Sequence, residues 1–328
     1  MWEDIWLGYG AIHGKSHLRQ HIGDLIEVAV TAKPEPIKPG FRFLDETIGG
    51  YYPGELTTLC GFEDNGKTAF VITQINRIAV DHHIPTLLVL DNMKLETFIA
   101  LMASYYCGIT TKDIHSVLTS PLYKDSVSEY LDKLKAAPLY IWEENFLSTE
   151  NIDISAIEYI IKEQDIRIVF YDEVMNYYDY NNAKAGNILK RLALNTNVPV
   201  VATCSIVRDQ DSEYSAEITL SSFCRFGGFH GSDVIISITD FEKMEIYTDE
   251  RGRRLRGIIQ LKVLKYKGTI ERKRGLFDRK ALLMRKAAIE MKKLKLMKQN
   301  AGDNILLNKL IEDMGGDIIE DSYKDEFD

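Results

Sequence analysis

The sequence GFEDNGKT at residues 61–68 decides the fold of this chain. It satisfies the pattern GxxxxGK[ST], and it lies directly between the apolar run ELTTLC at 55–60 and a helix-period segment at 67–80. Glycines in such a loop let the backbone N–H groups wrap around a phosphate, and the start of the following helix adds partial positive charge. The pattern therefore predicts a loop that binds a nucleoside triphosphate, against the alternative of a purely structural glycine turn.

The residues of this loop have separate expected roles. Lys67 is expected to contact the β- and γ-phosphates of ATP, and the Thr68 hydroxyl to coordinate Mg²⁺. Glu63 and Asp64 place two carboxylates beside a polyanion, which weakens nucleotide binding unless they point outward or pair with a basic residue. The expected nucleotide-binding residues of the loop and the helix start are Gly61, Asn65, Gly66, Lys67, Thr68 and Ala69.

A second acidic element lies at the end of the apolar run IRIVFYD at 166–172. A carboxylate at the end of a strand beside a phosphate loop holds Mg²⁺ or a water bound to it, so Asp172 is predicted to act with Thr68 at the metal. Glu173 follows directly and has two interpretations. It orients the attacking water as a general base, or it is a solvent-facing glutamate at a strand end.

Short apolar runs alternate with helix-period segments between residues 41 and 277. Continuous hydrophobicity indicates strands that are covered on both faces, and helices between the first five runs indicate a mostly parallel sheet. We therefore predict an α/β fold whose last strands form an antiparallel edge or hairpin. The expected strands are 55–60, 86–91, 138–142, 166–172, 199–204, 233–238 and 258–265, and the expected helices are 67–80, 94–107, 125–136, 151–164 and 184–196.

The composition excludes several classes of protein. Of the 328 residues, 45% are hydrophobic and 27% are charged, which excludes a collagen-like, low-complexity or wholly disordered chain. No apolar stretch reaches the length of a membrane span, and Glu3 and Asp4 lie where a signal peptide carries basic residues, so we expect a cytoplasmic protein without a membrane partner. The cysteines form no CxxC pair, and buried free thiols are expected at Cys60, Cys107, Cys204 and Cys224.

Charge is distributed unevenly along the chain. Residues 251–298 contain 18 Lys and Arg against three acids, whereas the whole chain has a net charge of −9. This stretch either contacts nucleic acid or includes a charged, solvated helix, and the acidic end of the chain is a possible competitor for it. A helix-period segment at 15–32, followed by prolines, indicates a linker helix. The expected domains are the linker helix with its Pro-rich connector at 1–40, an ATPase domain at 41–278, and a basic helix with an acidic tail at 279–328.

The sequence resembles the RecA-like motor domain of DnaB-type replicative helicases. The similarity is collinear in five segments, FRFLDETIGGYYPGELTTLCG (41–61), TLLVLDNMKLETFIALMASYYCGI (86–109), APLYIWEENFLS (137–148), IVFYDEVMNYY (168–178) and LKRLALNTNVPVVATCSIVRD (189–209). The resemblance implies a ring-forming ATPase, usually a hexamer, with nucleotide at subunit interfaces and single-stranded DNA in a basic channel. It also implies a basic finger from the neighbouring subunit, and Lys265 and Lys267 occupy the family's Lys-x-Arg positions. The family's N-terminal primase-binding domain has no counterpart in these residues.

The sequence departs from the family pattern at three positions. Asn92 replaces the glutamate that activates water, Ser205 replaces the glutamine that senses the γ-phosphate, and Lys267 replaces the finger arginine. An amide does not accept a proton at neutral pH, so another base is needed, with Glu173 as the first choice and Asp91 as the second. Lysine also lacks the planar fork of arginine and is a weaker transition-state clamp. The family's DNA-channel positions correspond to Tyr177, Tyr178, Tyr180, Arg208 and Arg225, where the tyrosines have packing at strand ends as their alternative.

Three functions are compatible with these residues. The first is an ATP-driven helicase or translocase that acts on single-stranded DNA as a ring, of phage or mobile-element type. The second is a degenerate ATP-binding module that serves as a nucleotide-dependent scaffold or regulator with little hydrolysis. The third is a RecA-like ATPase of the clock or recombinase type. The observation of filaments instead of closed rings would favour this third function. For the first function, the expected catalytic residues are Lys67, Asp172, Glu173 and Lys267. Lys265 is expected to contact the nucleotide, and Thr68 and Asp172 are the expected metal ligands.

Overall fold

The apolar runs of the sequence lie side by side in one sheet. The computed structural model describes residues 35–90, 93–109, 113–143, 154–174, 182–206, 218–225, 231–270 and 273–279. In this part of the chain the sheet has nine strands in the order β3-β2-β4-β5-β1-β6-β7-β8, and β9 pairs with β7. The strands are β1 (Leu56–Gly61), β2 (Thr86–Leu90), β3 (Leu139–Glu143), β4 (Ile168–Val174), β5 (Val200–Ser205), β6 (Val234–Asp240), β7 (Ile258–Tyr266), β8 (Thr269–Ile270) and β9 (Arg274–Asp278).

The prediction that the last strands form an antiparallel hairpin at the edge of the sheet is confirmed, and the first strand of that hairpin also continues the parallel part of the sheet. β7 pairs antiparallel with β6, β8 and β9, but β6 itself is parallel to β1, with Thr57 opposite Val234. A parallel pair needs a crossover connection, and here that connection contains the short helix α10 (Leu220–Arg225). A helix of six residues is too short to give a recognisable period in the sequence.

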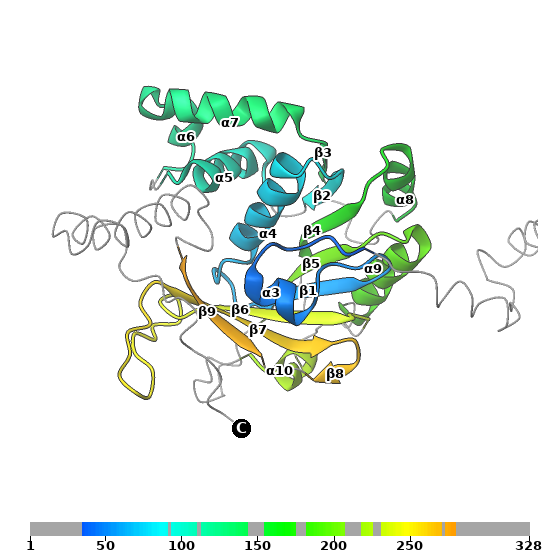
Figure 1. Ribbon diagram of the computed structural model, residues 1–328, viewed down its shortest axis with the longest axis vertical. Helices are drawn as coiled ribbons and strands as arrows, with labels where there is room; N and C mark the ends of the chain where they lie inside the picture. Colours follow the sequence, from blue (N-terminus) through cyan, green and yellow to red (C-terminus); the bar gives the residue numbers. More distant parts are fainter. Residues whose placement is uncertain are drawn as a thin grey trace, which may run out of the picture. The chain divides into compact units, whose positions relative to one another are not determined.

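Helices cover both faces of the sheet (Figure 1). One core contains residues of α4 (Lys67–Ile75), α5 (Leu95–Cys107) and α7 (Lys124–Ala136), and the other contains residues of α8 (Ile154–Glu163), α9 (Asn182–Thr196) and α10. The remaining helical elements are α3 (Arg42–Thr47), the π-helical turn η1 (Asn76–Asp81), α6 (Ser116–Thr119) and the 3₁₀ turn η2 (Pro121–Tyr123).

Strand β2 shows how the sheet separates the two cores. Its residues Leu88 and Leu90 belong to the first core, whereas Leu87 and Val89 belong to the second. Successive side chains of a strand point to opposite faces, so a strand between two helical layers must be apolar at every position. The predicted α/β architecture, a mostly parallel sheet with helices on both faces, is therefore confirmed.

Two expectations from composition are tested within the described residues. Cys60, Cys107 and Cys204 are buried free thiols as predicted, and burial raises the pKa of Cys204 to about 12. None of the helices that the structure describes has the length and apolar character that crossing a bilayer requires. The Cys224 side chain, the helix predicted at 15–32 and the segment beyond residue 279 lie outside the described part of the chain.

Candidate nucleotide site

Three parallel strands end together at the phosphate loop. β4, β5 and β1 are neighbours in the sheet, so their carboxyl ends lie at one edge, where open α/β sheets bind ligands. Gly61 ends β1, Asp172 and Glu173 lie close to the end of β4, and Ser205 ends β5. The fold thereby brings together the two predicted motifs, which are far apart in the sequence.

The phosphate loop leaves the amino terminus of α4 open to an anion. Gly66 precedes this helix in the left-handed region, with φ of 89°, and no side chain caps the helix. Gly61 has no room for a side chain, because a Cβ atom there would lie 2.9 Å from Ile238. The first N–H groups of α4, which starts at Lys67, therefore have no helical acceptor and suit a phosphate.

The two acids of the loop are exposed to solvent. Glu63 and Asp64 are both exposed, whereas Asn65, Lys67 and Ala69 are buried. Exposed carboxylates are screened by water, so their repulsion of a bound nucleotide is small.

Lys67 lies inside the loop with its ammonium group already engaged. The residue is 5% exposed, and Nζ donates hydrogen bonds to Phe62 O at 3.0 Å and Gly61 O at 3.4 Å. The Oε1 atom of Glu173 is 3.7 Å from Nζ. The positive charge is thus held at the place where the phosphates of a nucleotide would lie, but an acid competes for it.

Asp172 is a buried carboxylate between two hydroxyl groups. It is 4% exposed, and Thr203 Oγ1 donates a hydrogen bond to its Oδ1 at 2.7 Å. Burial raises the pKa of Asp172 to about 6, although hydrogen bonds from Thr203 and Thr68 act in the opposite direction. A cation at this position would relieve the cost of burying the charge.

The oxygen atoms of Thr68 and Asp172 fit a magnesium ion that arrives with a nucleotide. Within the described ranges there is no cluster of three or more His, Cys, Asp or Glu that could hold a metal alone. Mg²⁺ bound to nucleotides takes one or two protein oxygens and completes its shell with phosphate and water oxygens. This donor set therefore suits Mg²⁺ with a triphosphate, as the sequence predicts.

Glu173 turns toward the loop and not toward solvent. Its side chain is 21% exposed, its Oε1 accepts a hydrogen bond from Ser205 Oγ, and the same oxygen is the one near Lys67. The peptide bond between Asp172 and Glu173 is cis. These contacts disfavour the solvent-facing interpretation, while the role as a general base stays a prediction.

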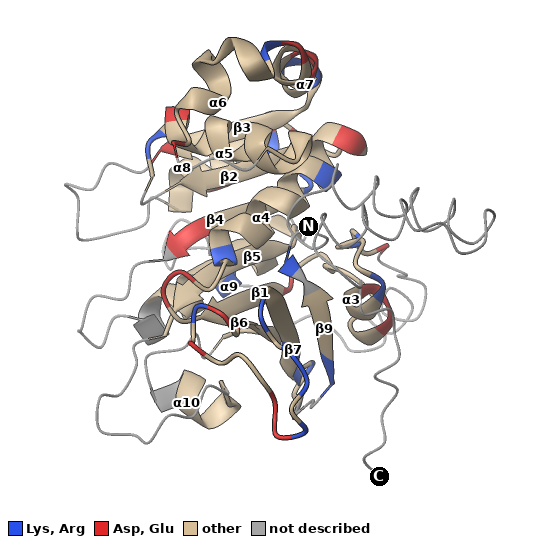
Figure 2. Ribbon diagram, turned by 90° about the vertical axis from the view of Figure 1, so that its left-hand side faces the viewer, with Lys and Arg blue, Asp and Glu red and all other residues tan. Residues whose placement is uncertain are grey.

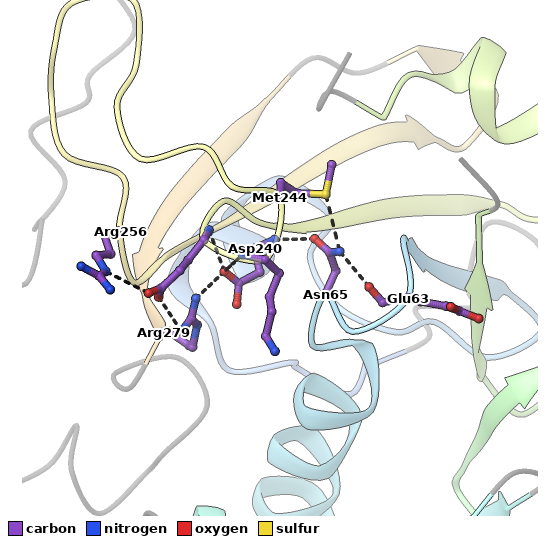
Figure 3. Close-up of polar contacts among 8 residues, drawn as sticks. Glu63, Asn65, Asp240, Met244, Arg256 and Arg279 are labelled. Atoms are coloured by element: carbon purple, nitrogen blue, oxygen red, sulfur yellow. Dashed lines mark hydrogen bonds and ion pairs between the residues drawn. The ribbon is translucent and has the colours of Figure 1, made fainter. Parts of the chain in front are cut away.

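Asn65 ties the tip of the loop to the end of β6 (Figure 3). Its Oδ1 accepts from the Asp240 backbone N–H at 2.7 Å, and its Nδ2 donates to Glu63 O at 3.1 Å. The Asp240 carboxylate in turn pairs with Arg279, which also reaches Glu242 at 2.9 Å. The Asn65 side chain is a structural anchor of the loop, and the predicted contact of this residue with nucleotide stays a prediction.

Lys265 and Lys267 lie at the opposite edge of the sheet. The Lys267 N–H donates to Asp233 O, and Asp233 N–H donates to Leu56 O, so Lys267 is level with the first residue of β1. The phosphate loop begins at the other end of this six-residue strand, roughly 16 Å away at 3.3 Å per residue. Neither lysine therefore contacts the phosphate loop of its own chain.

Both lysines are held by local partners. Lys267 Nζ is 3.1 Å from Glu55 Oε1 and lies 3.8 Å from the centre of the Tyr52 ring. Lys265 Nζ donates to Ser232 O at 2.6 Å. A finger role for Lys267 requires a second subunit and the release of the Glu55 contact.

The described residues of the basic stretch at 251–298 lie along strand β7 and at its two opposite ends. Arg253 and Arg256, on the loop between β6 and β7, pair with Asp249 and Glu242, and Figure 2 shows both signs of charge along this loop. Because β7 crosses the sheet, that loop and Lys267 lie at opposite edges. The residues from 280 to 298 lie outside the described part of the chain.

Several predicted residues have no structural description. The residues outside the described ranges are Asp91, Asn92, Tyr177, Tyr178, Tyr180 and Arg208. The side chain of Arg225 is not described either. Their proposed contacts with water, nucleotide or DNA stay predictions.

Sequence reasoning missed Thr203 and Asp240. Thr203 is fully buried and orients Asp172, and Asp240 anchors Asn65. A polar residue inside an apolar strand is the available signal, because a buried polar group needs a partner. The runs PVVATC and DVIISITD contain such residues, but only the sheet order identifies their partners.

The sequence matches the family model described as the DnaB-like helicase C terminal domain over residues 36–266. No curated protein matches it by sequence. Among solved structures, the ATPase domain of G40P is similar with a TM-score of 0.62 and 15% identity, over 78% of this chain and 93% of that one. A DnaB-like replicative helicase, described with its interactions with primase, has a TM-score of 0.60 and 15% identity, over 83% of this chain and 67% of the other. At 15% identity the similarity to these solved structures shows the fold alone. The family is shown by the match to the family model, which extends over most of the chain.

Proposed function

Because this chain belongs to the family of DnaB-like helicase C-terminal domains, we propose that it is an ATP-driven motor that moves along single-stranded DNA as a ring, of phage or mobile-element type. The observation that carries the proposal is the convergence of Lys67, Asp172 and Glu173 at the open amino terminus of α4. A structural glycine turn would not require a buried lysine and two acids at the same place.

The residues of this site have distinct tasks in hydrolysis. Lys67 leaves its carbonyl partners and the Glu173 carboxylate to stabilise charge on the β- and γ-phosphates. Thr68 and Asp172 would hold Mg²⁺, which would neutralise charge on the phosphate oxygens. Glu173 accepts the proton of the attacking water, because its carboxylate lies beside Lys67, where the phosphates are expected. The amide of Asn92 cannot accept a proton.

Completion of the site requires a neighbouring subunit. Lys267 lies at the opposite edge of the sheet from its own phosphate loop, so it can stabilise a transition state only in another copy of the chain. This geometry supports head-to-tail association, in which the Lys267 edge of one subunit meets the loop edge of the next.

A second candidate is a nucleotide-dependent scaffold with little hydrolysis. The observation in its favour is that Lys67, Glu173 and Lys267 all have partners within the chain that a bound nucleotide must displace. Such contacts stabilise the nucleotide-free chain and therefore oppose turnover.

ATP turnover, with and without single-stranded DNA, together with particle mass in the same buffer, separates these functions. The motor gives DNA-stimulated turnover by a ring, and Lys67→Ala abolishes it. Lys133→Ala, which removes an exposed lysine on α7, is the control and leaves turnover unchanged. Nucleotide-dependent assembly without turnover would instead identify the scaffold, and filaments in electron micrographs would favour the recombinase-type reading.

A further inference from the structure

A bulge in β4 turns two consecutive carboxylates toward the same neighbouring strand. The pairing between β4 and β5 is regular up to Tyr171 and shifts before Val174. In a regular strand the side chains of Asp172 and Glu173 would point to opposite faces, and a bulge re-aims side chains in this way.

The neighbouring strand β5 presents two hydroxyl groups to these carboxylates. Thr203 and Ser205 are two residues apart and therefore lie on the same face of β5. Thr203 Oγ1 donates to Asp172 Oδ1 at 2.7 Å, and Ser205 Oγ donates to Glu173 Oε1. Each acid of the site thus has its own hydroxyl partner.

We propose that Ser205 is the positioning residue that orients the Glu173 carboxylate toward the attacking water. The inference rests on the proposed hydrolytic function, because it assigns the residue that supports its general base. Ser205 acts through Glu173 and makes no contact with the γ-phosphate.

The competing partner of Glu173 explains why such a residue is needed. Lys67 Nζ is 3.7 Å from the same Oε1 atom, and an unrestrained carboxylate would move closer to this buried ammonium group. A glutamate paired tightly with Lys67 would occupy the lysine and lose its reach toward water. The Ser205 hydrogen bond holds Oε1 on the β5 side and leaves Oε2 as the proton acceptor.

The contact also gives two of the three departures from the family pattern, Asn92 and Ser205, a common explanation. With Asn92 at the position of the family's glutamate, the base lies on β4, and the residue at the end of β5 becomes its support. A short hydroxyl reaches Glu173 from this position, as the Ser205 contact shows.

The test compares Ser205→Thr with Ser205→Val, which have the same shape and differ only in the hydroxyl. We expect Ser205→Val to lower kcat about tenfold, the size of a lost hydrogen bond to a charged group, while Ser205→Thr stays within about twofold of the parent. The affinities for ATP and ADP should not change in either variant. Ser237→Ala removes a buried hydroxyl from β6, outside the site, and is the control with unchanged turnover.

A double-mutant cycle of urea unfolding measures the contact independently of turnover. Ser205→Val, Glu173→Ala and the double variant should show a coupling of about fivefold or more in the unfolding equilibrium constant. Equal kcat for Ser205→Val and Ser205→Thr, or no coupling in the cycle, would overturn the inference while the motor function stands. A loss of ATP affinity relative to ADP in Ser205→Val would also overturn it, because Ser205 would then contact the γ-phosphate. Absence of turnover in the parent chain would overturn the proposed function, and the catalytic meaning of the contact with it.

Discussion

Replacing Glu173 by Gln separates the binding of ATP from its hydrolysis. The change removes the charge that lies 3.7 Å from Lys67 Nζ but keeps the shape of the side chain and an oxygen that can accept from Ser205. Two opposite effects are expected. Lys67 is released for the phosphates, and the proton acceptor is lost.

The distance sets the size of the first effect. At 3.7 Å and an effective dielectric constant of about 20, the gross attraction between the charges is about 4 kcal/mol. Desolvation and side-chain ordering offset most of it, so the net strength of the pair is about 1 kcal/mol. ATP must replace this pair, and its removal should tighten ATP binding by about fivefold.

The second effect follows from general-base catalysis. Loss of a positioned base lowers turnover by about a hundredfold or more. Calorimetry with ATP and Mg²⁺ measures the affinity, and phosphate release measures kcat. Glu63→Gln removes an exposed carboxylate from the same loop and should change neither quantity by more than about twofold.

Two results would refute this reasoning. Normal hydrolysis by Glu173→Gln would place the base elsewhere, with Asp91 as the next choice. Weaker ATP binding by Glu173→Gln would mean that the carboxylate supports Lys67 for the nucleotide and does not compete with it.

Three further predictions concern the rest of the site. Burial raises the pKa of Asp172 from 3.8 to about 6, so its charge destabilises the folded chain. This destabilisation is absent below about pH 4, where the carboxyl is protonated in both states, and complete above about pH 6. Asp172→Asn should therefore stabilise the nucleotide-free chain by up to about 3 kcal/mol at pH 7.5 but not at pH 4, as measured by urea unfolding, while it weakens binding of Mg²⁺ with ATP. Lys267→Ala should lose most of the ATP turnover. An equal mixture of Lys267→Ala and Lys67→Ala should regain about a quarter of the parent's turnover by random assembly, because Lys267→Ala keeps Lys67 in the loop and Lys67→Ala keeps the Lys267 finger. No recovery in the ATPase assay would exclude a role between subunits. Asn65→Ala removes the hydrogen bond to the Asp240 N–H and should lower the free energy of unfolding by about 1–3 kcal/mol, with weaker ATP binding in calorimetry. An unchanged melting temperature would show that Asn65 is not an anchor.

The elements with a strong local pattern were predicted with small errors in their ends. The run at 86–91 forms β2 at Thr86–Leu90, and the helix expected at 94–107 is α5 at Leu95–Cys107. Both signals depend on neighbouring residues alone, either a continuous apolar run or a period of 3.6. The direction of β6 was not predictable in this way, because it depends on a crossover whose helix is short.

The residues of the candidate site also differ in whether their neighbours in sequence are enough to predict them. Lys67 and Thr68 were predicted from a motif of eight consecutive residues, and their roles stay predictions. Thr203 has no such motif, and its partner Asp172 lies 31 residues away on the adjacent strand. Asn65 was predicted to bind the nucleotide, which stays a prediction, and the structure adds that its side chain contacts the end of β6, a strand about 170 residues further along the chain.

The sequence by itself determined the mostly parallel sheet and the family to which the chain belongs, and it contains the phosphate-loop motif. These properties follow from short-range patterns of glycine, charge and hydrophobicity, which reflect the local conformation of the backbone. Only the tertiary structure decided that Ser205 contacts Glu173, that Asn65 is an anchor, and that Lys267 lies at the far edge from its own loop. Each of these depends on strand order and register, and residues distant in sequence become neighbours only when the whole sheet has formed.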